Sequence, residues 1–144
     1  HRIRGLCARL ERATWGALHH LLRADSAKHL PGIVANLTTL DGEVAVHRLG
    51  DDIAKITEFL LECRSGRGFL VDLRAPTDVS GDVAQPVLIL ATRNDGAVSF
   101  EHGEALAATL PNVQFVEIDT PTHLLWLGKG SDRTAGAIDS FIRP

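Results

Sequence analysis

The most informative absence from this 144-residue chain is methionine. Because translation starts with Met, we expect the chain to be a processed product, a fragment or the visible part of a longer polypeptide. Tyrosine is also absent, so no site in the chain can use a phenol group. No apolar run approaches the roughly 20 residues that a membrane-spanning helix needs, and no apolar signal-peptide core follows the first residues. We therefore expect no membrane partner.

Basic charge and cysteine are scarce as well. The 15 basic and 18 acidic residues give a formal net charge of −3, which is unlike the dense basic face of a nucleic-acid binder. Cys7 and Cys63 lie far apart and form no CxxC pair, which argues against a structural zinc site or a disulfide framework. We expect a reduced, cytoplasmic setting. The 44% of apolar residues and 23% of charged residues are typical of a globular protein.

The first part of the chain has the leucine spacing of helices. This spacing predicts one helix over residues 3–23 and a second over 27–40, which Ser26 could cap. Asp41 and Gly42 are interpreted as a stop and a turn. A third helix is expected after an acidic pair, Asp51 and Asp52, since negative charge favours a helix N-terminus. The turn-rich residues 65–68 would end it.

The second part of the chain predicts an α/β fold. A connector at 74–85 leads to a strand over 86–91, a helix over about 100–110, a strand over 113–118 and a helix from Ser131 to about residue 142. Two parallel strands with one helix between them do not make a self-sufficient sheet. We therefore expect a larger sheet that is completed by a segment outside this sequence, or an open edge that pairs with another module or a second copy.

Two polar residues follow the two strands. Asp95 comes after the first and His123 after the second. Functional residues of open α/β sheets gather at the carboxyl ends of the strands, so neighbouring strands would bring both residues to one edge. A carboxylate there could orient the imidazole and leave its second nitrogen free as a base. The alternative is that Asp95 is only a turn residue and His123 only a loop residue.

Residues 86–100, PVLILATRNDGAVSF, resemble the strand and acid loop of the α/β-hydrolase superfamily, and residues 121–127, PTHLLWL, resemble its catalytic-histidine loop. The gap of 28 residues between Asp95 and His123 is typical of that family. The resemblance implies a helical cap over residues 1–75 and the C-terminal part of the hydrolase core over 76–144. It further implies that Asp95 orients His123, which acts as general base and acid.

The family also needs a nucleophile, which precedes the acid and usually lies in a G-x-S-x-G elbow. The chain has no such motif, and none of its serines lies on a strand-to-helix elbow. The loop that would form the oxyanion hole is missing too. The resemblance therefore implies that a nucleophile, Ser, Asp or Cys, lies in an N-terminal segment outside this chain. The alternative is that the chain is catalytically incomplete.

The resemblance implies hydrolysis of an ester, thioester or related acyl or carbon–carbon bond, with no metal or organic cofactor. Epoxide hydrolysis is not expected because the cap has no tyrosine, and dehalogenation is disfavoured. A small molecule with an apolar acyl or alkyl group is the expected substrate. A non-catalytic ligand-binding or interaction protein on the same fold is the alternative. The residues that could line the pocket are Trp15, Leu124, Leu125 and Trp126, although Trp15 could instead pack against the main domain.

Overall fold

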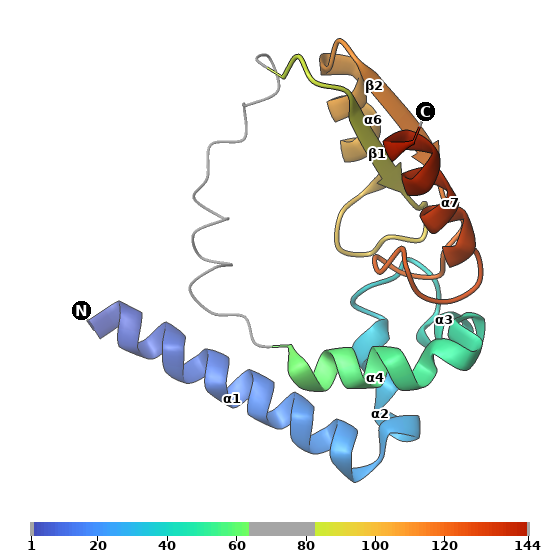
Figure 1. Ribbon diagram of the computed structural model, residues 1–144. Helices are drawn as coiled ribbons and strands as arrows, with labels where there is room; N and C mark the ends of the chain where they lie inside the picture. The colour runs from blue at the N-terminus through green and yellow to red at the C-terminus, as the bar shows by residue number, and fades with distance from the viewer. Residues whose placement is uncertain (1, 64–82, 144) are drawn as a thin grey trace.

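The computed structural model describes residues 2–63 and 83–143 (Figure 1). The predicted helix end at 65–68, most of the connector 74–85 and the domain boundary expected at residue 75 lie outside the described residues. The helices of the first part lie at the bottom of the view, and the strands with their two helices lie above them on the right. None of the helices in the described ranges is both long and apolar enough to cross a membrane.

Helices fill the first described range. They are α1 (Arg2–Ala24), α2 (Ser26–Val34), α3 (Gly42–Leu49), the short 3₁₀-helix η1 (Gly50–Asp52) and α4 (Ile53–Glu62). The side chains of α1 are described from Ala13 onward. The helices expected over 3–23 and after Asp52 are confirmed as α1 and α4.

The prediction for α2 was wrong at both ends. Asp25, not Ser26, caps the helix, because its carboxylate accepts a hydrogen bond from the N–H of Lys28. The helix ends at Val34 instead of residue 40. The side-chain amide of Asn36 donates to two carbonyl groups of the last turn and so satisfies groups that a helix end leaves open. The chain can therefore leave the helix at that point.

Helix α3 was not predicted, because Asp41 and Gly42 were interpreted as a turn. Asp41 is the N-cap of this helix, and its carboxylate accepts hydrogen bonds from the N–H groups of Glu43 and Val44. Gly42 is buried at the first helical position, where a Cβ would clash with the carbonyl group of Pro31. The glycine therefore allows α3 to start close against α2.

The second described range forms the expected strand–helix–strand–helix unit. Its elements are β1 (Val87–Ala91), α6 (Phe100–Thr109), β2 (Val113–Glu117) and α7 (Ser131–Ile142). The two strands are parallel, with a register that runs from Val87 opposite Val113 to Ala91 opposite Glu117. All five residues of β1 are half-buried, so the described residues leave this apolar strand partly exposed.

The apolar core joins the helical part to the loop that follows β2. Nine buried residues form one cluster, and two of them, Leu124 and Leu127, come from that loop. Burying a leucine side chain stabilises a fold by about 1.5–3 kcal/mol. The loop is therefore attached to the helices by apolar packing. The other members of the cluster are Leu22, Leu30, Val34, Ala45, Leu49, Ile56 and Leu60.

Candidate active site

Asp95 and His123 meet at the end of the two strands. Asp95 lies four residues beyond β1 and His123 six residues beyond β2. Oδ2 of Asp95 is 2.7 Å from Nδ1 of His123. The side chain of Asp95 is 11% exposed and that of His123 is 40% exposed. The prediction that the parallel strands bring these two residues to one edge is confirmed.

The carboxylate of Asp95 is held on both sides. Its Oδ1 accepts hydrogen bonds from the N–H groups of Ala97 and Val98, each 2.8 Å long. Its Oδ2 is thereby turned toward His123. An aspartate that accepts from N–H groups two and three residues ahead is a common turn motif. Asp95 is thus a turn residue and the partner of His123 at once, so the two interpretations left open by the sequence are compatible.

The second ring nitrogen of His123 is available for chemistry. When Nδ1 donates to a carboxylate, a neutral imidazole carries its lone pair on Nε2. Nε2 makes no hydrogen bond with the part of the chain that the structure describes, and the ring is partly exposed. The arrangement can therefore accept a proton at Nε2, and Asp95 can stabilise the imidazolium that results.

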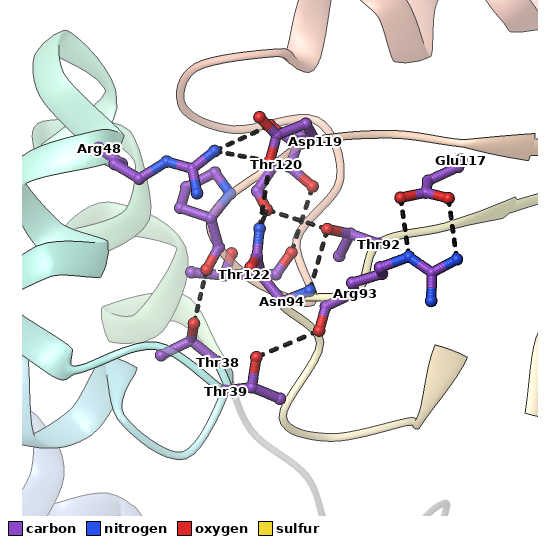
Figure 2. A network of polar contacts seen from close by, with 11 residues as sticks. Thr38, Thr39, Arg48, Thr92, Arg93, Asn94, Glu117, Asp119, Thr120 and Thr122 are labelled. Atoms are coloured by element: carbon purple, nitrogen blue, oxygen red, sulfur yellow. Dashed lines mark hydrogen bonds and ion pairs between the residues drawn. The ribbon is translucent and has the colours of Figure 1, made fainter. Parts of the chain in front are cut away.

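Short polar contacts join the two loops that carry this pair (Figure 2). Thr92 donates from Oγ1 to the carbonyl oxygen of Thr120 at 3.0 Å, and the side-chain amide of Asn94 donates to the same oxygen at 2.7 Å. Both threonines are fully buried. Buried polar groups that are paired in this way stabilise one arrangement of the loops and leave no unsatisfied donor or acceptor.

The helical part contacts the same loops through residues 37–39, of which Figure 2 labels Thr38 and Thr39. The N–H of His123 donates to the carbonyl oxygen of Leu37 at 2.8 Å, and the N–H of Thr39 donates to that of Asn94 at 3.0 Å. Thr38 forms an isolated antiparallel bridge with Asp95. No local pattern in the sequence predicts these contacts.

Asp119, the other carboxylate near His123 in the sequence, is engaged elsewhere. It forms an ion pair with Arg48 of α3 at 2.8 Å and accepts a hydrogen bond from Asn94. The Arg48 hydrogen bond is the main cause that lowers the pKa of this carboxyl below its usual range. Asp119 therefore joins α3 to the segment that follows β2.

The four residues predicted to line a pocket lie in different surroundings. Leu124 is only 4% exposed and belongs to the helical core. Leu125 is half-buried, and its carbonyl oxygen accepts a hydrogen bond from Thr134. Trp126 is 55% exposed and packs edge-on against Phe59 of α4, with 6.3 Å between ring centroids. Trp15 is half-buried on α1, and its ring centroid is 6.0 Å from that of His19. Their contact with a substrate stays a prediction.

In the described ranges, metal ligands form no cluster, and the thiol of Cys63 is not activated. Within the described residues, no group of three or more His, Cys, Asp or Glu side chains is placed to hold a metal ion. Cys63 is a free thiol at the end of α4, and burial raises its pKa. A raised pKa makes a thiol a poor nucleophile at neutral pH.

Comparisons with solved structures give likenesses over most of the chain. An alpha/beta hydrolase fold protein from Nakamurella multipartita has a TM-score of 0.69 and 22% identity, and the match covers 88% of this chain and 50% of that one. A thermophilic esterase from Thermogutta terrifontis, solved with malate bound, has a TM-score of 0.64 and 21% identity over 92% of this chain and 50% of that one. The chain has an α/β-hydrolase fold. The resemblance seen in residues 86–100 and 121–127 is thereby confirmed at the level of fold.

A curated relative that is named as a hydrolase matches a shorter part of the chain. The uncharacterized hydrolase YcgS of Bacillus subtilis (strain 168) is 32% identical over 83 residues, which are 55% of this chain and 29% of that protein. A scan against models of protein families found no match. The chain spans less than a third of this curated relative and half of each of the two solved structures.

Proposed function

We propose that this chain is part of a hydrolase in which Asp95 orients His123, and His123 acts as general base and then as general acid. The observation that carries the proposal is the 2.7 Å contact between Oδ2 and Nδ1, with Nε2 directed away from it and the ring partly exposed. The hydrolase fold of the solved relatives and the hydrolase name of YcgS support the reaction class.

The reaction that fits this pair is acyl transfer to water through a covalent intermediate. Nε2 takes the proton of a nucleophilic hydroxyl or thiol as that group attacks an ester or thioester carbonyl. His123 then returns the proton to the leaving alcohol or thiol, which departs. In the second half, His123 takes a proton from water as the water attacks the acyl group, and returns it to the nucleophile. Asp95 accepts the Nδ1 hydrogen bond throughout.

The nucleophile is proposed to lie in an N-terminal segment of the same protein outside this chain. The share of the relatives that the chain covers, about half of each solved structure, supports this proposal. We further propose that residues 1–75 act as a cap and that 76–144 belong to the core. An apolar acyl or alkyl group would then contact Trp15, Leu124, Leu125 and Trp126.

The experiment compares two histidine variants of the full-length protein that carries this chain. His123→Ala should lower kcat for a p-nitrophenyl ester with an apolar acyl group by roughly 10⁴-fold or more, as expected for a histidine that transfers the proton in both half-reactions. His102→Ala is the control, because His102 is exposed on α6. Equal turnover of His123→Ala and the control would remove His123 from the mechanism. Ester binding without turnover in the unsubstituted protein would favour a non-catalytic binding function.

A further inference from the structure

The segment between α2 and α3, residues 35–41, is built into the site although it belongs to the helical part. Three consecutive residues of this α2–α3 link contact both loops that carry the pair. The carbonyl group of Leu37 binds the N–H of His123, and Thr38 pairs with Asp95 through the antiparallel bridge. The N–H of Thr39 donates to the carbonyl oxygen of Asn94, the residue before Asp95. One short segment therefore holds the main chain on the acid side and on the histidine side.

Thr38 contributes its side chain as well. Its hydroxyl donates to the carbonyl oxygen of Pro121 at 2.7 Å and accepts a hydrogen bond from the N–H of Leu40 at 3.0 Å. Thr38 is only 5% exposed, so both bonds are shielded from water. Figure 2 shows Thr38 and Thr39 reaching from the link toward the loops that follow the strands. The hydroxyl of Thr39 donates to the main-chain carbonyl oxygen of Arg93, but this bond is exposed to solvent.

The link and the acid turn approach as closely as a glycine permits. A Cβ on Gly96 would lie 2.5 Å from the carbonyl oxygen of Thr38 and 2.6 Å from its nitrogen. Real Cβ atoms do not approach backbone atoms so closely. The bridge at Asp95 is therefore a tight contact, independent of the hydroxyl bond to Pro121.

We propose that Thr38 is a positioning residue for the Asp95–His123 pair. The inference rests on the proposed function. The hydroxyl of Thr38 fixes the carbonyl group of Pro121, and the carbonyl group of Leu37 fixes the N–H of His123. These two anchors lie on either side of Thr122, so they set the path of the main chain into His123. The bridge, with the bond from the N–H of Thr39 to Asn94, places the link beside Asp95, so both attachments bear on the distance from Oδ2 to Nδ1.

The test compares Thr38→Val with Thr38→Ser in the full-length protein. Valine keeps the shape of threonine but leaves the carbonyl group of Pro121 and the N–H of Leu40 without the hydroxyl, whereas serine restores it. Because a displacement of about 1 Å can cost 10²-fold in rate, we expect Thr38→Val to lower kcat by about tenfold or more with little change in KM. Thr38→Ser should recover most of this loss. Thr109→Val is the control, since it removes a similar hydroxyl bond on α6, remote from the site.

A second readout reports on the pair itself. In protein labelled with ¹⁵N-histidine, the proton on Nδ1 of His123 should give a shifted, weakened resonance in Thr38→Val and a normal one in Thr38→Ser. A folded Thr38→Val protein with an unchanged Nδ1–H resonance would overturn the proposal, whatever its kcat. If Thr38→Val does not fold, Thr38→Ala is compared with Thr38→Ser by the same measurements, and equal values would again overturn it.

The two proposals fail in different ways. Loss of the hydrolase proposal is seen as undiminished turnover in His123→Ala. Loss of the positioning proposal is seen as an Nδ1–H resonance that does not respond to the hydroxyl at residue 38, whatever the turnover is.

Discussion

Replacing Asp95 by asparagine would change the hydrogen-bond polarity of the site with little change of shape. The amide oxygen can take the place of Oδ1, because the N–H groups of Ala97 and Val98 both donate there. The amide nitrogen must then face Nδ1 of His123, 2.7 Å away in the unsubstituted protein. A donor at that position requires Nδ1 to become an acceptor, so the ring proton moves to Nε2. Nε2 then has no lone pair with which to accept the proton of the nucleophile.

The expected size of the effect follows from this change of tautomer. The same replacement in a serine protease triad leaves the geometry intact and lowers kcat by roughly 10⁴-fold. At about 1.36 kcal/mol for each factor of ten, this corresponds to about 5.4 kcal/mol of transition-state stabilisation. The effect on folding should be smaller, about 1.5–3 kcal/mol, because the three hydrogen bonds of the Asp95 carboxylate lose its charge while the turn is kept.

The assay measures kcat and KM of Asp95→Asn on a p-nitrophenyl ester, and the ¹⁵N shifts of the His123 ring. Asp119→Asn is the matched control, because Asp119 lies four residues before His123 and bonds Arg48 and Asn94 instead. The control should keep most of its activity. A loss of less than about tenfold in Asp95→Asn, with the proton still on Nδ1, would refute the orienting role.

Two further predictions concern stability. Gly96→Ala should lower the free energy of unfolding by about 1–3 kcal/mol, because its Cβ would crowd the main chain of Thr38; an unchanged urea midpoint would contradict the tight contact. The hydrogen bond from Lys55 is the main cause that lowers the pKa of Asp52 below its ordinary value of 3.8. Its stabilising contribution is therefore present above that pH and lost as the pH falls through the lower folded-state pKa. Asp52→Asn should therefore lose less unfolding free energy on acidification than the unsubstituted protein. If urea denaturation gives the same pH dependence of the unfolding free energy for both proteins, this prediction is wrong.

Much of the fold could be predicted from apolar spacing, and the errors arose where one local signal has two meanings. The continuous apolar run at Val87–Ala91 and the leucine pattern of α1 each have one simple structural interpretation. Asp followed by Gly at residues 41 and 42 begins a turn in one context and caps a helix in another. The choice depends on the close packing of α3 against Pro31 of α2, which no local pattern encodes.

The same reasoning separates the predictable part of the site from the rest. Asp95 and His123 could be found because their residue types, their spacing and the parallel strands all agree. The N–H donors at Ala97 and Val98 could have been inferred from the turn chemistry of aspartate. Thr38 could not, because its partner Pro121 is 83 residues away and the bond is to a main-chain carbonyl, which every residue has.

The way the two loops are anchored limits how the helices can move. The α2–α3 link is bonded to both loops, and the histidine loop is also attached to the helices by Leu124 and Leu127 in the core. If the helices swung away as one body to admit a substrate, they would take the histidine loop with them or break its core packing and its buried hydrogen bonds. Either outcome would disturb the main-chain bonds that hold Asp95 and His123 in place. Access by a substrate is therefore expected to involve elements other than α2, α3 and the link between them.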